Sequence, residues 1–291
     1  MRLIKSEIED LTPAKYTLKD VKKQIELAGR TCYKSENKIT DDSCEEFVQR
    51  MINMGHMSML EHGTIYLTIP IDKDTQVAPY IFTINPYSAI KFVDQVAYIT
   101  TNYRVIIENK LEECLKYMTE PTEHHYKRYT YRLICDRGVS HEIVRHRSMS
   151  FAQESTRYCD YSKDKFDNEI TYIIPTKLEG KLNSGQYTYW DDDWCDLNDY
   201  KIMYPCNNDD TDMFLQQLYN DESSYTFLIS SGWKPQEARQ ILPNALKTEI
   251  IVTGFEQDWQ AFIKLRSAKN AHPDIQKLAN ILLTNKDIKN I

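Results

Sequence analysis

Three arginines lie within 13 residues near the middle of the chain, in the segment RHRSMSFAQESTRY that spans residues 145–158. They are Arg145, Arg147 and Arg157, and His146 stands between the first two. A guanidinium presents a planar fork of donors that matches phosphate oxygens, so the grouping favours a phosphorylated or doubly anionic ligand. The residues also allow a second interpretation, a solvated basic helix end whose charges pair with an acidic surface.

A second polar group lies in GHMSMLEHG, residues 55–63, which contains His56, Ser58, Glu61 and His62. The segment follows a predicted helix and precedes a predicted strand, and polar residues in such a loop are candidates for a binding site. The competing interpretation is that the two histidines only cap or turn the chain.

Arg239 and Arg266 form a third group, each within or at the end of an apolar helical pattern. Arg266 follows Trp259, Phe262 and Leu265. An arginine on such a helix either extends along the apolar surface to water or points a permanent charge into a site. The periodicity does not decide between these two.

A zinc site is the obvious alternative for His141, Glu142 and His146, which resemble the helix of a zinc protease. That motif needs its histidines four residues apart so that both face one metal. Here they are five apart, which places them roughly 140° apart around a helix. The spacing therefore predicts no metal site.

The elements that position these residues follow from apolar periodicity and capping signals. We expect a short helix from Ser140 into Arg147, and Ser43 to begin a helix that stops at Gly55. No regular alternation of strand and helix is present, so the pattern predicts an α+β fold with mixed helices and a central antiparallel-type sheet. The other predicted helices cover 17–29, 103–118, 212–230, 235–242, 257–267 and 274–284, and the predicted strands cover 64–69, 129–135 and 170–175.

Composition narrows the class of protein. The 291 residues carry a net charge of −7, which disfavours binding to nucleic acid or to an acidic membrane surface. The seven cysteines are odd in number and form no CxxC pair, as expected in a reducing cytoplasm. No signal peptide or membrane span is predicted. We expect a single domain over 1–291, with long excursions at about 72–126 and 176–212.

Together the three groups resemble the signature of the flavin-dependent thymidylate synthases. The family pattern of arginine, histidine, arginine, seven residues and serine fits residues 145–155 without a gap, and VSHEIVRHR and SFAQESTRY continue it. GHMSMLEH, PQEARQILP and FIKLRSAKNAHPDIQ resemble further blocks of the family. The resemblance implies the family's fold, with the two excursions as insertions.

The resemblance also implies a reaction, a methyl transfer that converts dUMP to dTMP. The implied cofactor is FAD, with NADPH and 5,10-methylenetetrahydrofolate as co-substrates and tetrahydrofolate as product. It further implies a homotetramer whose flavin lies between subunits, so that one site draws residues from several chains.

Site residues carry over position by position. Arg266 is the implied catalytic residue, polarising the uracil ring. The implied dUMP contacts are Glu142, Arg145, Gln153, Glu154, Ser155, Thr156, Arg157, Arg239 and Arg266. The implied FAD contacts are Ser58, Glu61, Arg145, His146, Arg147, Gln153 and Asn270.

Four positions depart from the family pattern. Phe255 and Gln257 replace an asparagine and an arginine, and Asn270 replaces a histidine, with His272 two residues beyond it. Gln153 replaces a common glutamate, a variant known in the family. Two alternatives to the enzyme stay open, an inactive flavin- or nucleotide-binding relative and a nucleic-acid-binding protein. The second is disfavoured by the acidic charge and by the lack of interleaved aromatic residues.

Overall fold

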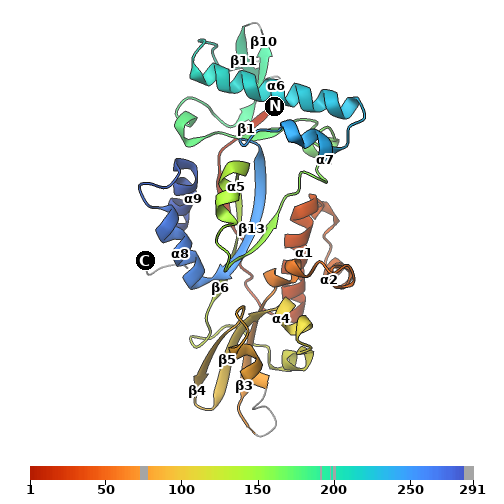
Figure 1. Ribbon diagram of the computed structural model, residues 1–291, viewed down its shortest axis with the longest axis vertical. Coiled ribbons are helices and arrows are strands. Elements are labelled where there is room, and N and C mark those ends of the chain that lie inside the picture. Colours follow the sequence, from red (N-terminus) through yellow and green to blue (C-terminus); the bar gives the residue numbers. More distant parts are fainter. Residues whose placement is uncertain (73–77, 191, 197, 199–200, 285–291) are drawn as a thin grey trace.

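The protein is built around one central strand. A computed structural model describes residues 1–72, 78–190, 192–196, 198 and 201–284. At its centre lies an antiparallel sheet with the strand order β2-β6-β13-β7, in which β13 is buried over nearly its whole length (Figure 1). The strands are β2 (Glu7–Asp10), β6 (Arg128–Asp136), β13 (Lys247–Phe255) and β7 (Ser150–Gln153).

Helices cover both faces of this sheet (Figure 1). Successive side chains of a strand point to opposite faces. Ile251 of β13 packs with Ala28 of α1 on one face, whereas Ile250 and Val252 pack with α5, α8 and α9 on the other. The helices are α1 (Leu18–Tyr33), α5 (Arg137–Ile143), α8 (Glu256–Arg266) and α9 (Pro273–Leu283).

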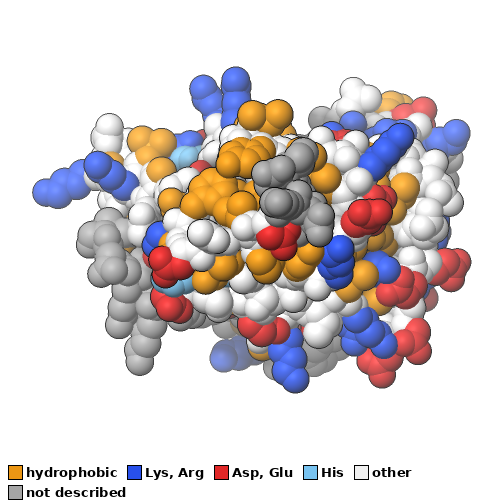
Figure 2. Space-filling view, turned by 90° about the horizontal axis from the view of Figure 1, so that it is seen from below, with side chains coloured by type: hydrophobic (Ala, Val, Ile, Leu, Met, Phe, Trp, Pro, Cys, Tyr) orange, Lys and Arg blue, Asp and Glu red, His pale blue; other side chains and the backbone are white. Residues whose placement is uncertain are grey.

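A second antiparallel sheet, with the order β3-β5-β4, forms the lower end of the molecule in Figure 1 and shares a core with α1 and α2. Apolar side chains are exposed at this end, including Tyr80, Ile84, Tyr87 and Phe92, and Figure 2 shows apolar side chains gathered there. The elements are α2 (Ser43–Asn53), η2 (Met57–His62), β3 (Thr64–Pro70), α3 (Ala78–Thr83), β4 (Ala89–Val93), β5 (Val96–Asn102), α4 (Tyr103–Glu108) and η3 (Glu112–Tyr117).

The upper end holds two small sheets on either side of α6, with β1 of the sheet β8-β1-β9 beneath the helix in Figure 1 and β10 and β11 of the sheet β10-β11-β12 above it. Trp194 and Tyr187 are buried there against α6. The elements are β1 (Arg2–Ile4), β8 (Thr171–Ile173), β9 (Gly185–Gln186), β10 (Thr188–Trp190), β11 (Asp193–Asp196), β12 (Lys201–Tyr204), α6 (Asp210–Ser230) and α7 (Pro235–Ala238). Single 3-10 turns lie at η1 (Glu36–Lys38), η4 (Asp164–Phe166), η5 (Thr176–Leu178) and η6 (Arg239–Ile241).

The α+β class and most of the long elements agree with the sequence-based predictions. Thr17 and Asp20 form the expected capping box of α1, and the strands predicted over 64–69 and 129–135 are β3 and β6. The four helices predicted after residue 212 are also present, the second as a single turn of α-helix followed by η6.

Three predictions were wrong. The helix expected over 103–118 ends at Glu108, because Lys110 has a left-handed backbone (φ 54°) that interrupts it before η3. Asp136, not Ser140, caps α5 by accepting a hydrogen bond from the Val139 N–H. This helix ends at Ile143, so Arg145 to Arg147 follow it in a turn.

Two central strands, β7 and β13, were not predicted at all. β13 is buried at all but its first and last residues, and β7 has only four residues, of which Ser150 and Ala152 are buried. Neither strand therefore shows a clear alternation of polar and apolar residues. Within the described residues, no helix has the length and apolar character needed to cross a membrane.

Candidate functional site

The last residue of α8, Arg266, reaches across to α5 and to the turn after it. Its Nη1 donates to Glu142 Oε2 at 2.5 Å, and its Nη2 donates to the Glu142 backbone carbonyl at 3.0 Å. Its Nε donates to His146 Nε2 at 3.1 Å. Three of the five N–H donors are thus used, which fixes the plane of the guanidinium and leaves two for a ligand. We call this the arginine cluster.

His146 is held neutral in the arginine cluster. Because Nε2 accepts a hydrogen bond, the ring carries its proton on Nδ1. Burial lowers the pKa of His146, and the charge of Arg266 lowers it further. The ring also packs against Phe262, with centroids 4.8 Å apart. At neutral pH the imidazole is therefore an acceptor that orients Arg266.

His141, Glu142 and His146 do not lie on one helix. Because α5 ends at Ile143, helical spacing does not relate His146 to His141, and the prediction made from that spacing was wrong in its premise. Within the described ranges, no group of three or more His, Cys, Asp or Glu side chains is placed to hold a metal ion.

Gln153, the last residue of β7, lies on the same face of the central sheet as the arginine cluster. Its Nε2 donates to Ser140 Oγ of α5 at 2.8 Å and to Thr248 Oγ1 of β13 at 3.1 Å. The amide therefore ties β7 to α5 and fixes the start of the loop that follows.

A chain of buried charges lies on the opposite face, towards the end of α1. Lys247 Nζ donates to Glu154 Oε2 at 3.0 Å and to Glu249 Oε1 at 2.5 Å. Lys34 Nζ donates to the same Glu249 oxygen at 2.7 Å. The Glu154 side chain is only 1% exposed. We call these four residues the buried ion chain.

The charges in the buried ion chain stabilise one another. Burial alone would raise the pKa of Glu249, but the ammonium groups of Lys247 and Lys34 outweigh it and lower the pKa to about 2. Burial likewise favours neutral Lys247, but Glu154 and Glu249 raise its pKa. Glu249 and Lys247 are therefore both charged at neutral pH.

The loop after Glu154 is pinned to this face. The Ser155 N–H donates to the Cys32 carbonyl at 3.0 Å. Arg239 Nη1 donates to Thr156 Oγ1 at 3.1 Å. Arg157 is exposed, and its guanidinium lies over the Tyr158 ring at 5.3 Å. Arg239 and Thr156 are thus in direct contact, and Arg157 is the next residue of the same loop.

The segment that holds Ser58 forms η2 and divides into exposed and buried residues. Ser58 and His56 are exposed, whereas Glu61 accepts a hydrogen bond from Arg104 Nη1 at 2.6 Å. His62 is fully buried, and its Nδ1 lies 2.9 Å from Thr253 Oγ1 of β13. Burial, with a smaller effect of the Arg128 charge, lowers the pKa of His62 to about 3.

Several predicted flavin contacts face solvent. Arg145, Arg147 and Asn270 are exposed, and in the described part of the chain neither arginine is paired with a carboxylate. Of the positions that depart from the family pattern, Gln257 is exposed, while Phe255 lies 5.4 Å from the guanidinium of the buried Arg128.

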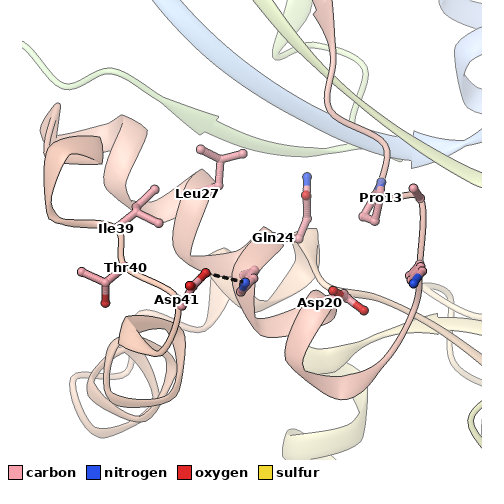
Figure 3. A pocket seen from close by; sticks show the side chains of 10 residues that line it. Pro13, Asp20, Gln24, Leu27, Ile39, Thr40 and Asp41 are labelled. Atoms are coloured by element: carbon pink, nitrogen blue, oxygen red, sulfur yellow. Dashed lines mark hydrogen bonds and ion pairs between the residues drawn. The ribbon is translucent and has the colours of Figure 1, made fainter.

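The surface pockets are lined by only some of the candidate site residues. One of about 350 Å³ lies beside the arginine cluster and is lined by Glu142, Val139, Phe214 and His272 among others. Another of about 730 Å³ runs along α1, where Lys23 pairs with Asp41 (Figure 3). That second hollow is lined by none of the predicted site residues.

Sequence reasoning missed the basic and acidic partners that organise the second face. Lys34, Lys247 and Glu249 belong to no motif, although two charges at alternate positions at the start of the apolar strand KTEIIVTGF are an available signal. A charge on a buried strand needs a partner, and Glu154 is that partner here.

Comparison with known proteins identifies the family. A model of the thymidylate synthase complementing proteins matches residues 86–286. The chain is 23% identical to a flavin-dependent thymidylate synthase of Mycobacterium avium over 261 residues, 88% of this chain and 71% of that protein. It is 32% identical to one from Thermococcus onnurineus over 145 residues, 50% of this chain and 48% of that protein.

Among solved structures, a UMP/dUMP methylase from Streptomyces cacaoi bound with 5-Br UMP aligns with a TM-score of 0.43 and 14% identity, covering 97% of this chain and 89% of that one. The family model spans more than half of the sequence and contains both the arginine cluster and the loop after Glu154. The chain therefore belongs to the family of thymidylate synthase complementing proteins.

Proposed function

We propose that the protein is a flavin-dependent thymidylate synthase that methylates dUMP. In the balanced reaction, dUMP, 5,10-methylenetetrahydrofolate, NADPH and one proton give dTMP, tetrahydrofolate and NADP⁺. The carbon replaces the hydrogen at C5 of the uracil ring, and two electrons from NADPH complete the methyl group. The observation that carries the proposal is the arginine cluster within a chain of this family.

Arg266 is the proposed catalytic residue. Its guanidinium is oriented by Glu142 and His146 and retains free donors, so it can hydrogen-bond the uracil carbonyl and stabilise negative charge on the ring. A preorganised donor in a site with little water stabilises such charge far more than a solvated one. Glu142 and neutral His146 act here as positioning residues.

The phosphate of dUMP is assigned to the second face. Arg157 and Arg239 supply guanidinium groups, and Ser155 and Thr156 supply hydroxyls from the pinned loop. Such charge-assisted contacts suit a phosphate dianion. Glu154 contributes indirectly, because its carboxylate is bound to Lys247 and fixes where the loop begins.

FAD fits the exposed residues of the signature. Arg145 and Arg147 are exposed arginines with no carboxylate partner in the described chain, and they flank the neutral His146 in the sequence. Ser58 is exposed as well. Unpaired guanidinium groups of this kind would hold the flavin diphosphate. When bound, the flavin supplies the hydride. Gln153, Glu61 and Asn270 complete the proposed contacts.

The two halves of the proposed dUMP site lie on opposite faces of the central sheet. Arg266 and Glu142 approach from the side of α8, and Ser155, Thr156 and Arg239 lie on the side of α1. In an oligomer, one subunit could present the uracil contacts and a neighbouring subunit the phosphate contacts, so that both sets of contacts lie in one site. We therefore propose a homotetramer with shared sites, formed from a single domain with insertions at about 72–126 and 176–212.

The seven cysteines are all free thiols, which supports a reducing cytoplasm as the proposed location. The decisive experiment is dTMP formation by the purified, FAD-loaded protein with dUMP, methylenetetrahydrofolate and NADPH. Tritium release from [5-³H]dUMP should depend on the folate. A yellow protein that binds dUMP and releases no tritium would instead be the inactive relative.

A further inference from the structure

A basic pocket of about 770 Å³ opens between the end of α1, α2 and the loop after Ser155. Five cationic side chains line it, and none of its lining residues is acidic. These side chains are Arg30, Lys34, Lys38, Arg50 and Lys165. In a chain of net charge −7, a concave surface of one positive sign concentrates anions.

Only two of the five charges are neutralised. Arg30 pairs with buried Glu26 at 2.7 Å, and Lys34 pairs with Glu249 at 2.7 Å. Lys38, Arg50 and Lys165 are exposed, and no carboxylate among the described residues pairs with them. The pocket therefore presents about three uncompensated positive charges to a ligand.

An aromatic wall accompanies these charges. Tyr33 and Tyr158 lie with ring centroids 4.9 Å apart, and both line the basic pocket. Tyr158 is 50% exposed and the Arg157 guanidinium lies over its ring, so the remaining exposed part of the ring is available to a ligand. A planar base can stack on such a ring while its phosphates meet the cations.

Three of the implied flavin contacts, Ser58, Arg145 and Arg147, are absent from the walls of the basic pocket, whereas His56 and Tyr158 from the same sequence blocks line it. The pocket therefore adjoins the proposed site without containing those three contacts. The buried ion chain also connects it to the nucleotide loop, since Lys34 lines the pocket and shares Glu249 with Lys247. Its cations and aromatic wall suit a second phosphorylated, base-containing molecule used in the same reaction.

We propose that the basic pocket binds the adenosine half of the nicotinamide dinucleotide reductant and selects the 2′-phosphorylated form. This rests on the proposed function, which requires such a reductant. A 2′-phosphate adds about 1.5 to 2 negative charges at pH 7, matching the uncompensated cations. An arginine is the usual partner of that phosphate, and Arg50 is the exposed arginine of the pocket.

Calorimetric titration of the FAD-loaded protein with NADP⁺ and with NAD⁺ tests the proposal. Wild type should bind NADP⁺ more tightly, and Arg50→Glu or Lys165→Glu should weaken NADP⁺ at least about tenfold and NAD⁺ much less. Lys116→Glu is the matched control, because Lys116 stacks on Tyr117 as Lys165 stacks on Phe166. Unchanged preference for NADP⁺ in both pocket variants would overturn the proposal.

Two further measurements separate the sources of the phosphate. Flavin absorbance should be retained in both variants, and loss of FAD with unchanged NADP⁺ affinity would assign the pocket to the flavin and overturn the proposal. Reduction by dithionite bypasses the nicotinamide, so dithionite-driven dTMP formation should stay within about twofold of wild type. Failure of wild type itself in that assay would refute the proposed function, while the titration still judges the pocket.

Discussion

The two faces of the central sheet both carry interacting charged side chains, but these side chains have different roles on the two faces. On the α8 face, Arg266 is held by Glu142, whose side chain is 34% exposed, and by a neutral histidine. On the α1 face, Lys247 is enclosed with Glu154 and Glu249, whose side chains are 1% and 10% exposed. On the α8 face, therefore, Arg266 keeps hydrogen-bond donors available to a ligand. On the α1 face, the charges are used to fix the loop that follows Glu154.

The α1 face should be the more sensitive of the two in stability. Lys247→Met leaves Glu154 buried without its cation, and breaking a buried pair in this way costs about 3–5 kcal/mol. Urea unfolding at pH 7 measures the loss. Lys177→Met is the control, because Lys177 is 80% exposed and its pair with Asp210 is screened by solvent and should contribute little to stability. Equal losses in the two variants would erase the distinction between the faces.

The α8 face should be the more sensitive in turnover. Arg266→Ala removes a preorganised donor and should lower kcat by about 10²–10³, or about 2.7–4 kcal/mol of transition-state stabilisation. Stability should change little, as measured by thermal unfolding beside the steady-state rate. Lys264→Ala, an exposed substitution on the same helix, should leave both quantities near wild type. Full activity in Arg266→Ala would remove its assigned role.

The buried histidine of the α1 face should appear in the pH dependence of stability. The unfolded chain protonates His62 near pH 6.5, but the folded chain does so only near pH 3. The free energy of unfolding should therefore fall as the pH drops below 6.5, and His62 contributes up to about 1.4 kcal/mol per pH unit. Urea unfolding at pH 7 and pH 5 should show a smaller difference for His62→Gln than for wild type. A slope unchanged by the substitution would contradict a neutral, buried His62.

The smallest expected effect is a change in the pKa of His146, the histidine of the α8 face, when Arg266 is replaced. Arg266 lowers the pKa of His146, so Arg266→Ala should raise that pKa towards its ordinary value. NMR titration of the His146 ring protons in wild type and in Arg266→Ala measures the change. An unchanged His146 titration would mean that burial alone controls it.

Local patterns were enough to predict the regular elements whose signals are contained within a few residues. The capping box of Thr17 and Asp20 begins α1, and the alternation of Ile65, Leu67 and Ile69 defines β3. The strand β13 escaped prediction because it is buried on both faces, so its residues do not alternate.

The contacts of the candidate site likewise divide into those that sequence motifs imply and those that only the folded chain brings together. The family resemblance implied that Glu142 and Arg266 contact dUMP and that His146 contacts flavin, and the structure places these three side chains in contact with one another. The partner of Glu154 lies 93 residues away at Lys247, and only the pairing of β13 with β7 brings the two side chains within reach. No local pattern encodes such a contact.

Lys34 also has an unusual backbone conformation at the end of α1. It ends α1 in the left-handed conformation, with φ 47° and ψ 57°, where glycine is usual and a side chain costs about 1 kcal/mol. Glycine would relieve this strain but would remove the ammonium group that Glu249 holds. The helix end is thus a compromise in which tertiary charge pairing overrides local conformational preference. Substitutions chosen only to optimise helix ends would weaken the protein here.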